Sequence, residues 1–323
     1  MNKELLALGV DLGGTTFTAG LLTRAGHLLG TASSPTPTES ATAVYAALEQ
    51  TGRRLLEAHG NPPLAGVGIG VPGLVVPATG QIIDCPNLAV MDGTNAAEQL
   101  RSSFVVDTAL VGNDAFCATL AELRYGAGQG AGNLLLLTLG TGVGGGVVLN
   151  DQAVRGPRQL MGEIGHMIVA PRGRKCGCGN FGCLEAMVAK QAMIDLALQR
   201  LQRGRASLLE ELSGGDDEAI TPELISQAAR QGDAVAAEVI GQVAEYLGIA
   251  ICNAILMLDP DRVLIGGGIA AAGELLLEPI RRTVRHRGRY ARFDTTQILP
   301  AQLGNLAGTY GAGALVWEGL RVN

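Results

Sequence analysis

The sequence lacks the excess of basic residues that nucleic-acid-binding proteins carry. Its 24 lysines and arginines are outnumbered by 30 aspartates and glutamates, so the 323-residue chain has a formal net charge of −6 at pH 7. We therefore expect no nucleic-acid partner, because such a surface normally shows a basic stripe. The one arginine-rich run, from Arg281 to Arg289, is more typical of a solvated helix end than of a nucleic-acid site.

Long hydrophobic runs are also missing. The longest uncharged apolar stretch, Tyr246 to Leu258, is shorter than the roughly 20 residues that an α-helix needs to cross a bilayer. The segment Met1 to Glu4 leads directly into a short apolar strand, without the pattern of a secretory signal peptide. We therefore expect no membrane association and a cytoplasmic location, which suits free thiols.

The P-loop motif G-x-x-x-x-G-K-[ST] is absent, which excludes a P-loop ATPase. The segment Gly140 to Gly145 does match the dinucleotide pattern G-x-G-x-x-G. That pattern requires a helix to open at its last glycine, whereas the β-branched pair Val147-Val148 predicts a strand here. A turn that cradles phosphate fits this segment better than a dinucleotide site.

Glycine is abundant, and its positions repeat. The 47 glycines are about twice the usual share. Leu5 to Leu22 reads strand, glycine turn, strand, and Leu134 to Leu149 has the same order; Leu64 to Gly73 is matched in the same way by Asp261 to Gly268. Two such halves predict a duplicated α/β fold with two lobes and a cleft between them.

The length of the chain is also that of about two domains. We predict an N-terminal α/β lobe at 1–123, with a C-terminal helix at about 302–323 packing back on it, and a C-terminal α/β lobe at 124–301 that contains the segment 163–185. Within these lobes the pattern predicts a strand from Phe104 to Val111 and helical spacing from Pro222 to Met257.

Two polar segments follow predicted strands in the first half. Asp11 ends a strand and precedes Gly13 and Gly14, which would bring backbone N–H groups close to an anion. A plain hairpin turn uses the same residue types, and both interpretations stay open. Asn113 and Asp114 end a later strand, where open α/β sheets place their ligands. A helix N-cap is the alternative, although no capping box supports it.

Three of the six cysteines lie within eight residues. Cys176, Cys178 and Cys183 are separated by glycines, and Glu163-Ile-Gly-His166 comes shortly before them. Three thiolates and one imidazole match the Cys3His shell of structural zinc sites. A redox pair or three unrelated thiols is the alternative, but Cys-x-Cys is awkward for a disulfide, and we interpret the segment as a zinc site.

Taken together, these motifs resemble the ROK family of sugar kinases and sugar-responsive repressors, which has an actin-like, ribonuclease-H-like duplicated fold. The resemblance covers nearly the whole chain, and the cysteine signature following Glu-x-Gly-His is its most specific part. The motifs that carry it are Asp11-Leu-Gly13-Gly14-Thr15, Gly70-Val-Pro72-Gly73, Asn113-Asp114-Ala115, Gly140-Thr141-Gly142-Val143-Gly144-Gly145-Gly146, Glu163-Ile-Gly-His166 and Cys176-Gly-Cys178-Gly-Asn-Phe-Gly-Cys183-Leu-Glu185.

The resemblance implies a role for each matching residue. Asp114 would be the catalytic base facing the sugar hydroxyl that is phosphorylated. The other sugar ligands would be Gly73, Asn87, Asn113, Glu163, His166 and Glu185. Magnesium with ATP would be held by Asp11, phosphates by Gly13, Gly14, Thr15, Gly140, Thr141 and Gly142, and adenosine by Gly266, Gly267 and Gly268. Structural zinc would be bound by His166, Cys176, Cys178 and Cys183.

The implied activity is that of an ATP-dependent kinase making glucose 6-phosphate, in a homodimer or a dimer of dimers. An N-acetylmannosamine, N-acetylglucosamine or other hexose kinase would carry the same signature, and polyphosphate is an alternative donor. Two departures are Thr16, often lysine in relatives, and the run Leu88 to Gly93, which lacks the tryptophan of many glucokinase-like members. A repressor is disfavoured, since Asp11 leaves no room for a preceding helix-turn-helix. A non-catalytic sugar sensor is disfavoured because Asp11 and Asp114 are both present.

Overall fold

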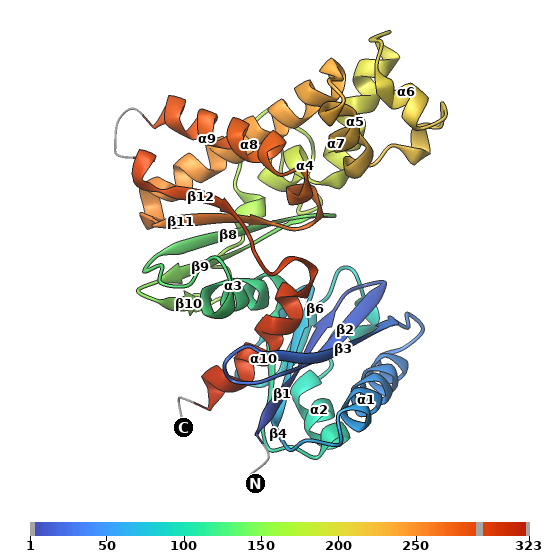
Figure 1. Ribbon diagram of the computed structural model, residues 1–323, viewed down its shortest axis with the longest axis vertical. Helices are drawn as coiled ribbons and strands as arrows, with labels where there is room; N and C mark the ends of the chain where they lie inside the picture. The colour runs from blue at the N-terminus through green and yellow to red at the C-terminus, as the bar shows by residue number, and fades with distance from the viewer. Residues whose placement is uncertain (1–3, 289–292, 321–323) are drawn as a thin grey trace. The chain divides into compact units, whose positions relative to one another are not determined.

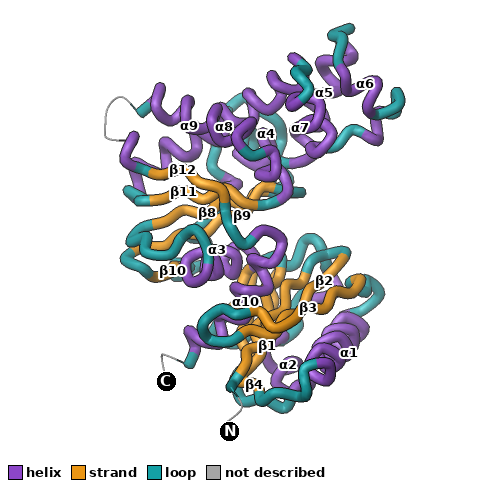
Figure 2. Tube along the Cα trace, viewed as in Figure 1, coloured by secondary structure: helices purple, strands orange, loops and turns teal. Residues whose placement is uncertain are grey.

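The structure is a computed structural model that describes residues 4–288 and 293–320 (Figure 1). The chain divides into two compact units. Unit 1 comprises Met1–Gly130, Ala153–Met161 and Gln302–Asn323, and unit 2 comprises Ala131–Gln152 and Gly162–Ala301. Each unit is built around a five-stranded sheet with helices packed on it (Figure 2).

The sheet of unit 1 has the strand order β3-β2-β1-β4-β7. Strands β1 and β2 are antiparallel, as are β2 and β3, whereas β4 and β7 continue the sheet in parallel with β1. The bounds are β1 Leu6–Leu12, β2 Thr16–Leu22, β3 Leu28–Pro35, β4 Leu64–Val71 and β7 Ala109–Asn113, with a small hairpin of β5 Leu74–Val76 and β6 Gln81–Asp84. The helices are α1 Ala41–Ala58, η1 Ala89–Met91, α2 Ala96–Phe104, α3 Asp114–Tyr125, η6 Gly304–Leu306 and α10 Ala307–Gly319.

Helix α10 lies unusually close to the sheet of unit 1. A Cβ atom on Gly68 of β4 would lie 1.8 Å from the carbonyl oxygen of Ala312, and one on Gly9 of β1 would lie 2.2 Å from that of Thr309. Only glycine permits such an approach of two backbones. The adjacent Leu8 lies against α1 instead: a Cβ on Gly52 of that helix would be 3.1 Å from the Leu8 side chain. Successive residues of β1 therefore face helices on opposite sides of the sheet.

Glu122 in α3 is a fully buried carboxylate that joins two distant segments of unit 1. Its Oε2 accepts a hydrogen bond from the backbone N–H of Ala127 at 2.8 Å. Its Oε1 accepts from the N–H groups of Gln302 and Leu303, both at 2.8 Å. Hydrogen bonds to a charged group are stronger than neutral ones, and an unpaired buried N–H is destabilising.

Glu122→Gln is therefore expected to lower the free energy of unfolding of unit 1 by about 3 kcal/mol, since glutamine keeps one oxygen and turns an amide donor toward N–H groups. The single tryptophan, Trp317, lies in α10, so its fluorescence follows the unfolding of unit 1 in urea. The exposed Glu57 of α1 is the matched control, and Glu57→Gln should change stability by less than about 0.5 kcal/mol. Equal midpoints for both variants would contradict this assignment.

The second sheet, whose strands β8, β9, β11 and β12 belong to unit 2, repeats the topology of the first, with the order β10-β9-β8-β11-β12. The pair β8 and β9 is antiparallel, and β11 joins β8 in parallel, as β1, β2 and β4 do in unit 1. The bounds are β8 Leu134–Leu139, β9 Val143–Leu149, β10 Gln152–Val154, β11 Arg262–Gly266 and β12 Gln297–Pro300. The helices are η2 Ile164–His166, α4 Leu184–Val188, α5 Lys190–Gln202, α6 Leu208–Leu212, η3 Asp217–Ala219, α7 Pro222–Arg230, α8 Ala234–Leu258, η4 Gly268–Ala272, α9 Glu274–Arg287 and η5 Phe293–Thr295. The predicted duplication is confirmed.

Two predicted elements were wrong in their bounds. Phe104 ends α2 rather than beginning a strand, because Val105 adopts a left-handed conformation (φ 53°), and β7 starts only at Ala109. The helical stretch predicted from Pro222 to Met257 is divided into α7 and α8. Gly232 has φ 88°, and the Asp233 side chain caps α8 by accepting a hydrogen bond from the N–H of Ala236 at 2.7 Å.

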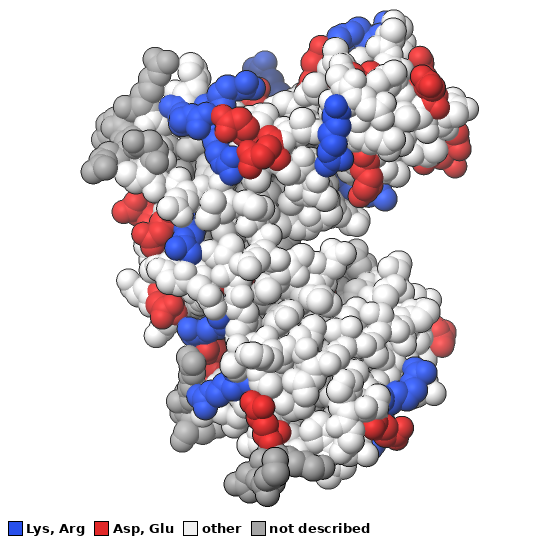
Figure 3. All heavy atoms as spheres, in the orientation of Figure 1, with Lys and Arg blue, Asp and Glu red and all other residues white. Residues whose placement is uncertain are grey.

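The arginine-rich run is part of α9 up to Arg287, and Arg289 lies outside the described residues. Arg281 and Arg285 form ion pairs with Glu274 and Glu278, while Arg287 pairs with Glu245 of α8. Figure 3 shows basic and acidic side chains interleaved over this part of unit 2. The interpretation as a solvated helix end is confirmed.

Among the described residues, α8 alone is long and apolar enough to cross a membrane. Its most apolar window is 61% buried, and the helix packs against α4, α5, α7 and α9. The core helix of a globular unit meets the same criteria, so α8 carries no argument for a membrane.

Candidate active site

The first group of candidate residues lies where β1 ends. Asp11 is near the end of this strand, and the turn from Gly13 to Thr15 connects it to β2. Thr36, just beyond β3, fixes the turn by donating its hydroxyl to the carbonyl oxygen of Gly13 at 2.8 Å and its N–H to that of Thr15 at 2.9 Å. The hairpin that the residue types allowed is present, and phosphate binding by the same turn stays a prediction.

Asp11 is mostly buried beside the start of α10. A Cβ on Gly308 would lie 2.3 Å from its carboxyl carbon. Burial, followed by the nearby negative charge of Asp114, raises the pKa of the Asp11 carboxyl from 3.8 to about 6. The folded chain therefore disfavours the ionised form of Asp11.

This raised pKa predicts a pH-dependent stabilisation by Asp11→Asn. The carboxyl of Asp11 ionises near pH 3.8 in the unfolded chain and near pH 6 in the folded one. The protonated carboxyl therefore adds to the stability of the fold below pH 3.8, and this contribution is lost as the pH rises through 6. At pH 8 the uncharged variant should be more stable in metal-free protein by up to about 3 kcal/mol, and the difference should shrink toward pH 4.

Urea unfolding followed by Trp317 fluorescence at both pH values measures the effect. The exposed Asp107 of unit 1 provides the control variant Asp107→Asn, for which we expect the same small change at both pH values. A stability of Asp11→Asn that does not depend on pH relative to the unmodified chain would contradict the assignment.

Asn113 and Asp114 lie where β7 meets α3. Asn113 is the N-cap of α3, since its Oδ1 accepts a hydrogen bond from the N–H of Phe116 at 3.1 Å. Its side-chain amide also donates to the carbonyl oxygen of Gly73 at 3.0 Å. Asp114 is the first residue of the helix, and its Oδ1 accepts from the N–H of Ala115 at 2.7 Å. The capping alternative holds for Asn113. The negative charge of Asp114 is the second cause, after burial, of the raised pKa of Asp11.

Asn87 is exposed in the loop between β6 and η1. The loop is closed by Asp92, whose Oδ1 accepts from the N–H of Cys85 at 2.8 Å. The backbone of Asn87 lies directly against the turn after β1, because a Cβ on Gly14 would be 2.6 Å from its carbonyl oxygen. Unit 1 thus brings its candidate residues together at the ends of β1, β4 and β7.

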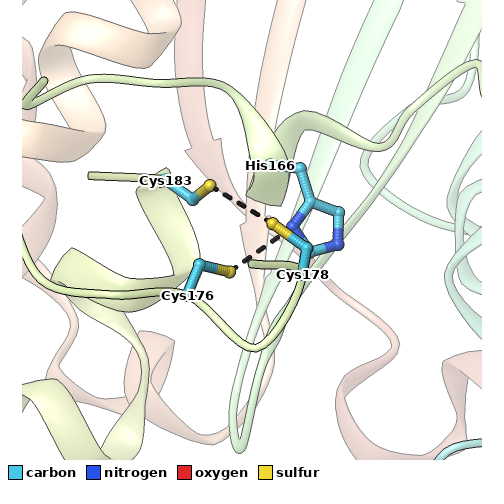
Figure 4. A group of neighbouring side chains, drawn as sticks. All are labelled: His166, Cys176, Cys178 and Cys183. Atoms are coloured by element: carbon cyan, nitrogen blue, oxygen red, sulfur yellow. Dashed lines mark hydrogen bonds between the residues drawn. The ribbon is translucent and has the colours of Figure 1, made fainter. Parts of the chain in front are cut away.

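In unit 2, the predicted metal ligands converge on one point (Figure 4). The ligand atoms of His166, Cys176, Cys178 and Cys183 all lie within 4.8 Å of one another. The Sγ atoms of Cys178 and Cys183 are 3.7 Å apart, as are Cys176 Sγ and His166 Nδ1. Donors bound to one tetrahedral zinc at about 2.0–2.3 Å would be roughly 3.5–3.8 Å apart, so both the residue types and their spacing fit the ion.

The local fold explains why four separate ligands meet. Isolated bridges pair Ile168 with Cys183 and Lys175 with Phe181, and these bend the segment back on itself. The N–H of Cys176 donates to the carbonyl oxygen of Asn180 at 2.8 Å. A backbone hydrogen bond at Asn180, together with the neighbouring thiols, lowers the pKa of the Cys178 thiol to about 7. This favours the thiolate of Cys178. Burial instead raises the pKa of the Cys176 thiol, and it raises the pKa of the Cys183 thiol to about 12, so these two would lose their protons only on binding a metal.

His166 presents different ring nitrogens to different neighbours. Its Nδ1 faces the cysteine cluster, and its Nε2 is 3.9 Å from Oε2 of Glu163. The side chains of both residues are about half exposed, at 41% and 52%. A metal on Nδ1 would therefore leave Nε2 on the Glu163 side of the ring.

Glu185 connects the cysteine cluster with the glycine turn after β8. Its Oε2 accepts a hydrogen bond from the N–H of Val143 at 2.9 Å, and its Oε1 is 3.8 Å from Cys176 Sγ. Lys190 fixes the other end of the turn by donating its N–H to the carbonyl oxygen of Gly140 at 2.9 Å. Val143 begins strand β9, which confirms that no helix opens after this G-x-G-x-x-G segment.

The third glycine segment, from Gly266 to Gly268, follows β11. Gly267 has φ 85°, and a Cβ on it would lie 2.3 Å from the carbonyl oxygen of Leu139 at the end of β8. The segment therefore lies beside the turn that begins at Gly140. Its proposed contact with adenosine stays a prediction.

Sequence reasoning missed several residues that shape these groups. Asp92, Lys190 and Gly308 each position a candidate residue but belong to none of the recognised motifs. For Gly308 a signal existed: Gly-Thr-Tyr-Gly-Ala-Gly inside a helical pattern indicates close backbone approach rather than an ordinary surface helix.

The comparison with known proteins decides the family. The ROK family model matches residues 7–318. The chain belongs to the ROK family. It is 36% identical to the glucokinase of Halalkalibacterium halodurans, over 96% of this chain and 94% of that protein. The crystal structure of a ROK family glucokinase from Streptomyces griseus in complex with glucose and AMPPNP matches with a TM-score of 0.84 at 34% identity, covering 97% of this chain and 99% of that one.

A repressor is also among the relatives of this ROK chain. The N-acetylglucosamine repressor of Escherichia coli is 31% identical over 97% of this chain, which spans 76% of that protein. The predicted family and its two-lobe, actin-like fold are confirmed, and the glucokinase relatives identify the chain as a sugar kinase that uses a hexose. Kinases of this reaction class act on ATP together with magnesium.

Proposed function

We propose that this ROK kinase transfers the γ-phosphoryl group of ATP to the 6-hydroxyl of glucose, with Asp114 as the general base. The observation that carries the proposal is the pair of carboxylates at one sheet edge of unit 1, in a chain 36% identical to a glucokinase. Asp11 pairs with Gly70 of β4, and a Cβ on Gly70 would lie 3.7 Å from the Cα of Asp114. Of two neighbouring carboxylates in a kinase, one can act as the base and the other can bind the cation.

Asp114 would accept the proton of the 6-hydroxyl as the oxygen bonds to phosphorus. Its hydrogen bond from the N–H of Ala115 fixes the carboxylate at the start of α3. Phosphoryl transfer requires mainly positioning and charge neutralisation, so a carboxylate that only accepts a proton late in bond formation is sufficient.

In the turns at Gly13–Thr15 and Gly140–Gly142, the N–H groups of Gly13 and Gly140 donate to the carbonyl oxygens of Thr16 and Gly142. The N–H groups that follow them in each turn would donate to phosphate oxygens. Magnesium held by Asp11 would supply charge neutralisation for ATP when bound. Binding it would also offset the burial penalty on the ionised form of Asp11. Residues Gly266–Gly268 would border the adenosine.

Sugar hydroxyls would be bound by Asn87, Asn113, Glu163, His166 and Glu185, beside the loop at Gly73. Carboxylates and amides suit this task because each hydroxyl both donates and accepts hydrogen bonds. A site that pairs with a given hydroxyl rejects sugars lacking it, since its buried polar groups would be left unpaired.

We further propose that His166, Cys176, Cys178 and Cys183 hold a structural zinc. The support is the donor set and the 3.7 Å spacings between ligand atoms. A closed four-ligand shell would not activate water. The residues themselves would fix the loop, so that His166 keeps Nε2 toward Glu163 for the sugar.

We also propose that the two units are the two lobes of the enzyme, that the protein is cytoplasmic, and that it forms a homodimer or a dimer of dimers. The family membership supports all three. Size-exclusion chromatography with light scattering measures the oligomeric state directly.

N-acetylmannosamine is the second candidate substrate. A putative N-acetylmannosamine kinase from Listeria monocytogenes matches this chain with a TM-score of 0.77 at 28% identity. The loop from Leu88 to Gly93, which lacks tryptophan, also weakens the assignment to glucose.

A coupled assay over glucose, mannose, N-acetylglucosamine and N-acetylmannosamine separates these candidates, with ATP and polyphosphate as alternative donors. We expect the highest kcat/KM for glucose with ATP. The acetamido sugars should be poorer by at least about tenfold, since a site matched to a hydroxyl discriminates strongly. Faster turnover of an acetamido sugar would overturn the glucose assignment, and faster turnover with polyphosphate would overturn the ATP assignment.

A further inference from the structure

One carboxylate in unit 2 lies against two parts of the proposed site. Oε2 of Glu185 accepts the hydrogen bond from the N–H of Val143, directly after the turn at Gly140–Gly142. Oε1 of the same side chain lies 3.8 Å from Cys176 Sγ. A residue that served only as a sugar ligand would have no need of either contact.

The turn is shaped to admit this carboxylate. A Cβ on Gly142 would lie 2.5 Å from Oε2 of Glu185, closer than any real contact allows. The glycine therefore permits the carboxylate to reach the N–H of Val143. The opposite end of the turn is held by the N–H of Lys190 on the carbonyl oxygen of Gly140. Both ends of the turn thus depend on the chain that follows the cysteine cluster.

Unit 1 contains the corresponding contact. There the turn glycine is Gly14, whose Cβ would lie 2.6 Å from the carbonyl oxygen of Asn87. In both halves of the duplicated fold, a turn proposed to hold phosphate is packed against a residue proposed to hold sugar. The contact in unit 2 is the more specific, because it uses a side-chain carboxylate and a backbone N–H.

We propose that Glu185 is a positioning residue that couples the sugar site to the phosphate-binding turn. Oε2 holds the N–H of Val143 and so keeps the turn in its binding conformation, while Oε1 lies beside Cys176 of the cysteine cluster, where it would meet the sugar. A hydroxyl bound at Oε1 would restrict the carboxylate and thereby the turn. Because coupling between two sites is reciprocal, nucleotide binding would strengthen sugar binding by the same factor. The inference rests on the proposed function, since it assigns phosphate to this turn.

The test is the affinity for a non-hydrolysable ATP analogue with magnesium, measured by calorimetry with and without glucose. Glu185→Ala should weaken binding without sugar by about tenfold, the value of one lost charge-assisted hydrogen bond, and should abolish the sugar-dependent gain. Glu185→Gln keeps an oxygen for Val143 and should bind the analogue without sugar as the unmodified chain does. Glu185→Asp keeps the charge but is one methylene shorter, and it replaces the alanine variant if that fails to fold.

Glu163→Gln is the matched control. Glu163 is also a proposed sugar ligand beside the cysteine cluster, but its carboxylate lies on the Nε2 side of His166. This variant should therefore lose sugar affinity while its affinity for the nucleotide without sugar stays unchanged. If Glu185→Ala and Glu185→Asp both bind the analogue without sugar as tightly as Glu163→Gln does, the coupling role is wrong. If the unmodified chain binds no nucleotide or phosphorylates no hexose, the proposed function itself fails, which is a distinct outcome.

Discussion

Asp114→Asn is expected to lower kcat for glucose phosphorylation by about 1,000-fold, within the range that a general base contributes. The substitution keeps the size of the side chain and an oxygen at the position that accepts the N–H of Ala115. It removes the group that would take the proton from the 6-hydroxyl. Sugar affinity, measured by calorimetry, should change by less than about tenfold, because the hydroxyl can still donate to the amide oxygen.

The control for this experiment is Asp107→Asn, which removes an exposed carboxylate of the same unit and should leave kcat unchanged. Turnover of Asp114→Asn within a few-fold of the unmodified chain would show that another group is the base. An equal loss of sugar affinity and turnover would instead make Asp114 a sugar ligand alone.

Removal of the proposed zinc should have the second largest effect. Purified protein is expected to contain about one zinc per chain, and Cys176→Ala should lose the metal together with at least about 90% of the activity, because the cluster fixes the loop carrying His166 and Glu185. Elemental analysis gives the metal content, and kcat and KM for glucose are measured on the same samples.

The matched variant is Cys252→Ala, which removes a buried thiol of α8 outside the cluster. It should retain both zinc and activity. Chelation of the unmodified chain provides a second route to the metal-free state without changing any residue. A metal-free sample with full activity would contradict the structural role of the ion.

The duplicated topology was predictable because it depends on local patterns. Each half repeats a buried strand, a glycine turn and a second strand. The order of these elements can be predicted from local patterns, without knowledge of any long-range contact. The cysteine cluster was predictable for a similar reason: its ligands are close in sequence, and the donor types indicate the ion.

Other features depend on contacts between distant residues. Nothing near Glu122 in the sequence shows that its carboxylate accepts N–H groups from residues 302 and 303. The end of α2 at Phe104 was not predicted, because an apolar residue is compatible with both a helix end and a strand. The left-handed conformation of Val105 ends the helix there. The hydrogen bond between Glu185 and Val143 was likewise hidden, since the two lie 42 residues apart in the sequence.

The position of α10 in the chain determines the order in which the two units can fold during synthesis. The hydroxyl of Thr309 reaches the carbonyl oxygen of Thr18, a contact that spans 291 residues. The N-terminal strands therefore leave the ribosome long before the helix that covers one face of their sheet. All of unit 2 is translated in that interval, so it can form its core first, and unit 1 must wait for the last turns of the chain.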